Sequence, residues 1–231
     1  MAATAGRQVV KYNFYKVAPE WRRLSTAERE QSKAEFASMV EETALDMQVR
    51  SYSLVGVRAD ADILLWCIAP DLEQHHELAA MLNRTRLGAF LATTYSYLAM
   101  TRHSQYVAEH KHSGQEGTRL TLEPGAAPYL VVYPFVKTRP WYTLPREERQ
   151  AMMNAHFAVG HKYPSVRINT TYSFGLDDQE FVLAFETSSL SDFQDLVVDL
   201  RETRASAYTL RDTPIFTAIA RPLLECLDAL G

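Results

Sequence analysis

The sequence predicts an α+β protein that is made of two related halves. A weak internal repeat relates them, because the segment WRRLSTAER that begins at Trp21 aligns with WYTLPREER, which begins at Trp141, 120 residues later. The segment 82–89 matches 200–207 at nearly the same spacing. A spacing that holds over about 70 positions indicates duplication of one structural unit.

Each half carries the same order of predicted elements. An extended apolar run opens each one, VVKYNFYKV at 9–17 and PYLVVYPFV at 128–136. A helix follows, entered at the capping sequence Ser25-Thr-Ala-Glu28 in one half and after Pro145 in the other. The remaining elements, first half and then second, are two strands (52–57 and 63–69; 167–176 and 180–186), a helix (71–86; 190–204) and a closing strand (92–100; 215–220). The order β-α-β-β-α-β is that of the ferredoxin-like unit, and two such units are expected to form a dimeric-α+β-barrel-type body.

A polar segment divides the two halves. Residues 103–128 are rich in Gly, Pro and charged side chains, so the expected boundaries are 1–102, a linker at 103–128, and 129–231. A linker of this length can fold over the mouth of a pocket as a flap.

Composition narrows the classes of partner. The chain is 47% hydrophobic and 23% charged, with a formal net charge of −4. A nucleic acid or an anionic membrane would favour a basic surface, so neither is expected as a partner. We find no apolar stretch of membrane-spanning length and no N-terminal signal pattern, which favours a cytoplasmic protein. Cys67 and Cys226 lie far apart in apolar surroundings and are expected to be buried thiols.

The two halves differ at one chemically important position. His156 stands where the repeat has Phe36. The predicted helix 146–158 places Met152, His156 and Val159 near one face. A single histidine on an apolar helix face suits both a core residue and a metal ligand, and the residues alone leave both interpretations open.

The second half also contains several short motifs in a fixed order. They are Tyr-Pro-Phe-Val-Lys from Tyr133, Trp-Tyr from Trp141, Met-Met followed by His156, and Ser-Phe-Gly-Leu-Asp-Asp from Ser173. In this combination the chain resembles the chlorite dismutase / coproheme decarboxylase family of haem proteins, densely over 128–220 and thinly before residue 100. The resemblance implies two ferredoxin-like halves and a homo-oligomer, commonly a pentamer.

The resemblance also implies a haem ligand. The family's proximal ligand falls at His156, which would bind the iron of haem b or of iron coproporphyrin III. Chlorite-active members carry an arginine thirteen residues further on, and this chain has Asn169 there. An uncharged side chain disfavours chlorite and suits neutral hydrogen peroxide.

Roles for other residues follow from the decarboxylase branch. Its Tyr-Pro-x-x-Lys motif implies that Tyr133 forms a radical that removes hydrogen from a propionate, and that Lys137 lies near a second propionate. Spacing alone does not distinguish Tyr133 from Tyr129 on the same strand. By family position, Arg119, Arg201 and Ser206 would bind propionates.

The base that deprotonates the incoming peroxide is not assigned. The actinobacterial branch has a histidine in the linker at the position of Glu116, and His110 or His112 could replace it.

The leading hypothesis is therefore hydrogen peroxide-dependent oxidative decarboxylation of iron coproporphyrin III to haem b. The alternatives are a chlorite dismutase-like or peroxidase-like haem enzyme, and a haem-binding carrier or sensor without turnover. The fold by itself does not choose among them.

Overall fold

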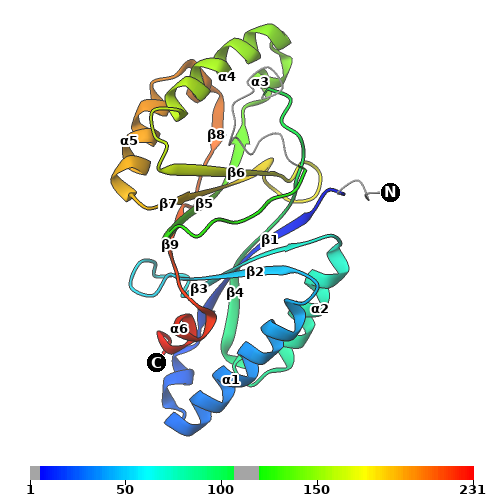
Figure 1. The fold of residues 1–231 in the computed structure, drawn as a ribbon, viewed down its shortest axis with the longest axis vertical. Helices are drawn as coiled ribbons and strands as arrows, with labels where there is room; N and C mark the ends of the chain where they lie inside the picture. Colours follow the sequence, from blue (N-terminus) through cyan, green and yellow to red (C-terminus); the bar gives the residue numbers. More distant parts are fainter. Residues whose placement is uncertain (1–5, 107–119) are drawn as a thin grey trace. The chain divides into compact units, whose positions relative to one another are not determined.

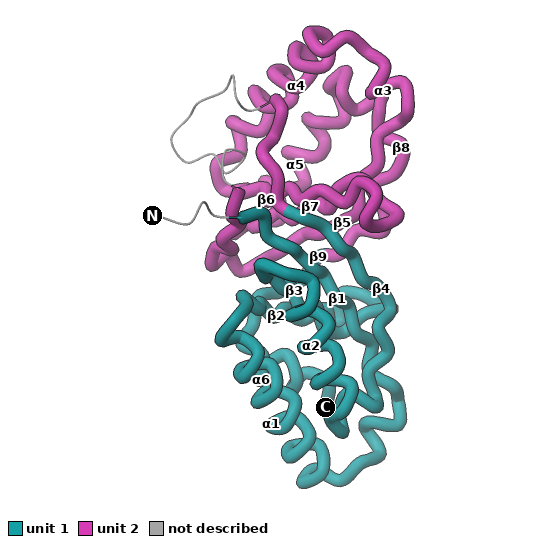
Figure 2. The backbone as a smooth tube through the Cα atoms, turned by 90° about the vertical axis from the view of Figure 1, so that its right-hand side faces the viewer, with its two compact units in different colours: residues 1–100, 217–231 teal, residues 101–216 magenta. Residues whose placement is uncertain are grey.

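The computed structural model describes residues 6–106 and 120–231 of the chain. The chain divides into two compact units (Figure 2). Unit 1 comprises Met1–Met100 together with Thr217–Gly231, and unit 2 comprises Thr101–Phe216.

Unit 1 is an antiparallel sheet covered by helices on one side (Figure 1). Its strands lie in the order β4-β1-β3-β2, and β2 also pairs with β9, where Tyr52 opposes Ala220. The elements are β1 (Val9–Val17), α1 (Thr26–Thr43), β2 (Gln48–Ser53), β3 (Ile63–Ala69), α2 (Leu72–Arg84), β4 (Leu91–Met100), β9 (Phe216–Ala220) and α6 (Leu223–Asp228), with 3-10 helices at Pro19–Arg23 and Gly88–Phe90.

The core of unit 1 is filled with apolar side chains. Every residue of β3, a central strand of the sheet, is buried. Phe36 of α1 and Leu82 of α2 pack with Leu65 of β3 in one cluster. Ser25 caps α1 in the predicted manner, because its hydroxyl accepts from the backbone N–H of Glu28 while the Glu28 carboxylate accepts from the Ser25 N–H.

Unit 2 repeats the same plan. Its sheet has the order β6-β7-β5-β8, and α4 and α5 lie on one side of it (Figure 1). The strand order of both units is therefore that of the ferredoxin-like fold, which confirms the predicted fold class. The elements are β5 (Tyr129–Lys137), α3 (Arg139–Thr143), α4 (Arg146–Gly160), β6 (Val166–Tyr172), β7 (Phe181–Thr187), α5 (Leu190–Arg201), a 3-10 helix (Arg204–Tyr208) and β8 (Thr209–Arg211).

The boundary between the units differs from the expected one. The strand predicted at 215–220 to close the second half is β9, which is a neighbour of β5 as predicted and also pairs with β2, and its residues from Thr217 onward group with unit 1. Its continuation, α6, is held against α1 by an ion pair between Lys33 and Asp228 at 3.0 Å. The short strand β8, which was not predicted, also pairs with β5.

The second predicted strand lies earlier in the chain than expected, at Gln48–Ser53 and not at 52–57. It ends at Ser53, because residues 54–57 form a turn in which Gly56 has a φ of 77°, a conformation that glycine adopts without strain.

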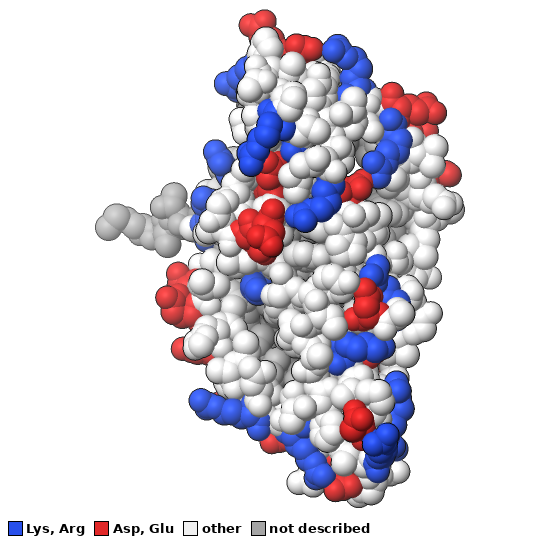
Figure 3. All heavy atoms as spheres, turned by 180° about the vertical axis from the view of Figure 1, so that it is seen from behind, with Lys and Arg blue, Asp and Glu red and all other residues white. Residues whose placement is uncertain are grey.

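The described residues include no helix long and apolar enough to cross a membrane. On the face drawn in Figure 3, lysine and arginine side chains are interspersed with aspartate and glutamate.

Candidate functional site

The register of the unit 2 sheet decides which side chains share a face. Tyr133 of β5 opposes Leu183 of β7, and Leu183 opposes Thr170 of β6. Directly opposed residues of antiparallel strands point to the same side, so these three side chains lie together. Tyr133 also packs in one cluster with Leu196 of α5 and near Val159 of α4. This side, which we call the helix side of the unit 2 sheet, is therefore the one that α4 and α5 cover.

The helices leave part of this side uncovered. Ile168 is 42% exposed and Thr170 is also exposed, although both point to the helix side. On the opposite side of the same sheet, Val132 of β5 and Ala184 of β7 are completely buried. An apolar side chain between a sheet and its helices is ordinarily buried, so Ile168 and Thr170 mark an uncovered, uncharged surface.

His156 lies on α4, within reach of the charge of Lys137. Its helix neighbours Met152 and Val159, one turn before and after it, both pack in the interior of unit 2, as the predicted face required. Burial and the nearby charge of Lys137 lower the pKa of His156 to about 4. Within the part of the chain that the structure describes, no group hydrogen-bonds to its ring. At neutral pH His156 is therefore an uncharged imidazole with a lone pair to offer a metal.

Lys137 lies at the end of β5, on the same side as Tyr133. Its Nζ donates to the carbonyl oxygen of Ala205 at 2.9 Å and lies 4.5 Å from the centre of the Trp141 ring. Burial lowers the pKa of Lys137 to about 8, and the carboxylate of Glu180 opposes this shift. Lys137 thus carries a partly buried positive charge near His156.

Glu180 fixes this end of β5, a role that sequence reasoning did not predict. One of its oxygens accepts from the backbone N–H of Lys137 at 2.8 Å and from the hydroxyl of Tyr142 at 2.5 Å. The only sequence signal was its place directly after the turn Asp177-Asp178-Gln179.

Tyr133 is a buried phenol. Its ring stacks on Phe185 with the centroids 5.6 Å apart. Burial raises the pKa of Tyr133, the charge of Asp212 raises it further and the charge of Arg201 opposes this, so the phenol is protonated at neutral pH. The alternative, Tyr129, opposes Thr187 at the far end of β5 from Lys137.

Arg201 is the last residue of α5, and Ser206 lies in the 3-10 helix that follows. The guanidinium of Arg201 forms an ion pair with Asp212, directly after β8. Ser206 follows Ala205, whose carbonyl receives the Lys137 ammonium. The structure therefore associates Tyr133, Lys137, His156 and Arg201 with one side of unit 2, and Ser206 is adjacent in the chain to the Ala205 that Lys137 contacts.

Asn169 does not join this group. It opposes Ala184, so it points away from the helix side. Its side chain is buried and donates to Glu186 at 2.8 Å. A step of one residue along a strand moves a side chain to the other face. The residues of β6 that border the site are therefore Ile168 and Thr170, and the expectation that Asn169 lines the pocket is corrected.

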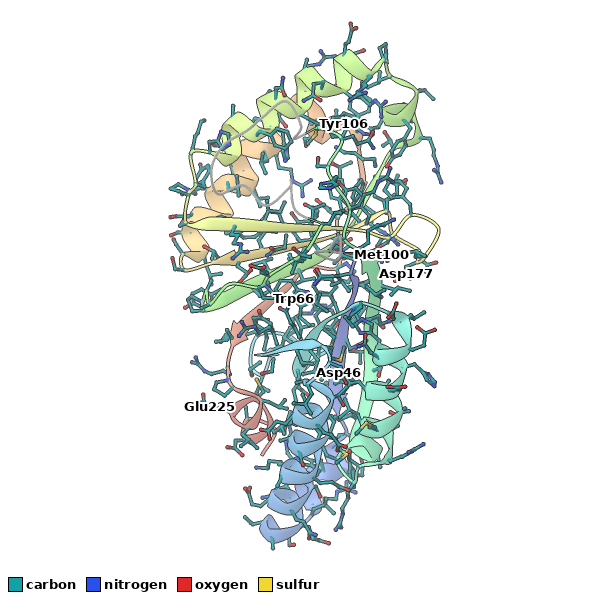
Figure 4. The ribbon with its side chains drawn as sticks, turned by 45° about the vertical axis from the view of Figure 1, so that its right-hand side comes forward. Asp46, Trp66, Met100, Tyr106, Asp177 and Glu225 are labelled. Atoms are coloured by element: carbon teal, nitrogen blue, oxygen red, sulfur yellow. The ribbon has the colours of Figure 1, made fainter. Side chains whose placement is uncertain are left out.

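The remaining predicted residues cannot be placed. Arg119, Glu116, His110 and His112 lie outside the described residues. The described end of the preceding segment runs beside α4, where Gln150 donates to the backbone oxygen of Tyr106 at 3.0 Å (Figure 4). The ring of Tyr106 also packs on Trp141.

Together these groups suit a particular kind of ligand. Ile168 and Thr170 offer an uncharged surface, and His156 offers one nitrogen donor. Lys137 and Arg201 offer positive charge for carboxylates. A single imidazole suits a metal whose other positions are filled by a macrocycle, so a flat metallated ring with acidic side groups fits these residues.

Comparisons with known proteins agree with this arrangement. The family model of chlorite dismutase matches residues 29–221. The chain is 38% identical to the coproheme decarboxylase of Mycolicibacterium smegmatis over 167 residues, which cover 72% of this chain and 70% of that protein.

Solved structures resemble the chain over nearly its whole length. A mutant chlorite dismutase from Candidatus Nitrospira defluvii has a TM-score of 0.88 and 28% identity, and the match covers 96% of this chain and 94% of that one. The chlorite dismutase of the same organism in complex with imidazole has a TM-score of 0.87 and 27% identity, with coverage of 96% and 94%. On the family match and the coproheme decarboxylase relative, the chain belongs to the chlorite dismutase family.

Proposed function

We propose that this chain is a haem enzyme that uses hydrogen peroxide to decarboxylate iron coproporphyrin III to haem b. The observation that carries the proposal is a buried, protonated phenol, Tyr133, on the same side of unit 2 as His156 and two cations, Lys137 and Arg201. The relative that is named coproheme decarboxylase supports the same reaction.

The protein would hold the porphyrin at three kinds of contact. His156 would bind the iron, since its lowered pKa keeps the imidazole neutral. Lys137, Arg201 and Ser206, with Arg119 from outside the described residues, would bind propionates. When bound, the iron and peroxide together supply the oxidising equivalents.

Tyr133 would transfer hydrogen from the substrate. Its phenol first gives up an electron and a proton, and the resulting radical oxygen takes a hydrogen atom from the β-carbon of a propionate. Loss of carbon dioxide and of one further electron leaves a vinyl group. Each propionate anion thus consumes one peroxide and one proton, and yields carbon dioxide and two waters. Two such rounds convert the substrate into haem b.

The sheet side of the site favours peroxide over chlorite. Ile168 and Thr170 carry no charge, so β6 provides no cation there to hold an anionic oxidant or its leaving group. This argument replaces the one from Asn169 and leads to the same preference. Chlorite turnover is the second candidate function because the similar solved structures are chlorite dismutases.

The test is to load the full chain with iron coproporphyrin III, titrate hydrogen peroxide and follow the porphyrin mass. We expect two successive losses of carbon dioxide. Tyr133→Phe should abolish both, whereas Tyr129→Phe, the matched control on the same strand, should retain them. A constant mass while the porphyrin absorbance bleaches would contradict the proposal, and sustained oxygen release from chlorite would favour the second candidate.

A further inference from the structure

The ion pair between Arg201 and Asp212 lies at the edge of the candidate site. Val136 of β5 opposes Arg211 of β8, so Arg211 takes the face of Val136. The next residue, Asp212, follows β8 directly, and its charge and that of Arg201 both act on the Tyr133 phenol. Its guanidinium partner comes from the last residue of α5. The carboxylate of Asp212 is therefore already paired with the Arg201 guanidinium at the candidate site.

This pair is set apart from the other cation of the site. The Lys137 ammonium donates to a neutral acceptor, the carbonyl of Ala205, and the carboxylate of Glu180, whose charge acts on it, accepts from the Lys137 backbone N–H instead. Arg201 is paired with a full negative charge. Its side chain is 51% exposed and that of Asp212 is 20% exposed, so an incoming anion can reach the guanidinium.

We propose that Asp212 is an internal substitute for a substrate propionate. This inference rests on the proposed function, in which Arg201 binds a propionate. A carboxylate of the porphyrin and the carboxylate of Asp212 have the same chemistry, so they compete for one guanidinium.

The competition has a consequence for product release. While the corner of the porphyrin near Arg201 carries a propionate, Asp212 must give up or share its partner. Once that propionate has become a vinyl group, the ion pair between Arg201 and Asp212 forms again without opposition. Asp212 thus lowers the affinity for the substrate, which has four carboxylates, and leaves the affinity for the product, which has two, unchanged. The protein therefore binds substrate and product with more similar affinities than it would without Asp212.

The test compares two metal-free porphyrins, so that it does not depend on turnover. Binding of coproporphyrin III, with four carboxylates, and of protoporphyrin IX, with two, is measured by fluorescence titration. Asp212→Asn should tighten coproporphyrin binding by about five-fold, the upper range for a partly exposed ion pair, and should leave protoporphyrin binding within about two-fold. Asp199→Asn removes the same charge from α5, where Asp199 pairs with Lys162, and is the matched control with no expected effect.

A double-variant cycle isolates the pair. Arg201→Gln should weaken coproporphyrin binding, and adding Asp212→Asn to it should change nothing further. Weaker coproporphyrin binding in Asp212→Asn, or equal tightening for both porphyrins, would overturn the inference and would mean that Asp212 only orients Arg201. Thermal unfolding of each variant checks that it is folded.

The outcomes separate this inference from the proposed function. If the wild-type chain decarboxylates iron coproporphyrin III but Asp212→Asn fails to discriminate between the porphyrins, only the inference fails. If the chain does not decarboxylate, the proposed function fails whatever the binding of the metal-free porphyrins shows.

Discussion

Units 1 and 2 have the same strand order but fill the space between helices and sheet differently. In unit 1, Phe36 of the first helix is 1% exposed and packs against Leu65 of the sheet in a continuous apolar cluster. In unit 2 the corresponding helix position is His156, and the sheet residues Ile168 and Thr170 are exposed on the side that the helices cover. The same fold thus encloses a filled apolar core in unit 1, whereas in unit 2 it leaves an exposed surface near a histidine that can bind a metal.

The difference shows how a repeated unit can acquire a site. Closing the space with an aromatic side chain contributes buried apolar area and therefore stability. In unit 2 this space is open, so Ile168 and Thr170 contribute less buried area to the stability of the fold. A ligand can bury their surface instead. The comparison predicts that substitutions at corresponding positions affect stability in unit 1 and ligand binding in unit 2.

The largest effect is expected from His156→Phe. This change gives unit 2 the residue of unit 1, and it removes the proposed iron ligand. We expect the affinity for iron coproporphyrin III to fall by more than about 100-fold, beyond the usual effect of losing a group that merely supports a ligand. A titration followed at the Soret band measures it. His161→Phe, at the exposed end of the same helix, is the control, and an unchanged Soret band in His156→Phe would mean that another residue binds the iron.

Phe36→Ala tests the other half of the comparison. Truncation of a completely buried phenylalanine should lower the free energy of unfolding by about 3–5 kcal/mol, because it removes apolar contacts and leaves a cavity. Urea denaturation measures this change. Porphyrin affinity of the folded variant should equal that of the wild type, and a parallel loss of affinity would show that the two units are not functionally distinct.

Asn169→Ala tests the assignment of Asn169 to the side away from the site. The variant deprives the buried carboxylate of Glu186 of a hydrogen-bond donor, so unfolding should become easier by about 1–3 kcal/mol. Peroxide reactivity of the porphyrin complex should not change. Ile168→Ala is the companion variant on the neighbouring residue, and it should alter peroxide reactivity at a smaller cost in stability because Ile168 is partly exposed. The reverse pattern would restore Asn169 to the site.

The smallest effect is the pH dependence that His156 contributes in unit 2, in addition to that of His75 in unit 1, whose pKa burial also lowers. The pKa of His156 is lowered from 6.5 to about 4, so below pH 6.5 the unfolded chain takes up a proton that the folded chain refuses. Its contribution to stability is complete above pH 6.5 and disappears as the pH falls toward 4. After discounting for partial exposure, we expect a loss of about 1–2 kcal/mol over this range. Urea denaturation of wild type and His156→Phe should differ by this amount, and identical pH profiles would contradict the lowered pKa.

Much of the molecule could be predicted because its signals are local. The capping box at Ser25 and the apolar runs that became β1 and β5 depend only on neighbouring residues, and all of them formed as expected. The association of Tyr133 with Lys137 also follows from strand alternation, since residues four apart on one strand share a face.

Other features depend on partners that are distant in the sequence. The hydrogen bonds of Glu180 join two segments that are 43 residues apart, and no pattern in either segment indicates them. The strand 215–220 lies beside β5 as predicted, but its additional pairing with β2 depends on tertiary contacts. The placement of Asn169 depends on the register between β6 and β7, where an error of a single residue exchanges the two faces.

The sequence by itself determined the order of the elements, the duplication and the kinds of side chain available for chemistry, because these are properties of short segments and their repetition. Only the tertiary structure decided that Ile168 and Thr170, rather than Asn169, border the site. It also decided that Asp212 forms an ion pair with Arg201, and that the space between helices and sheet is filled in unit 1 and open in unit 2. Each of these depends on which surfaces meet in three dimensions, and burial and charge pairing act between surfaces that the chain brings together only when it folds.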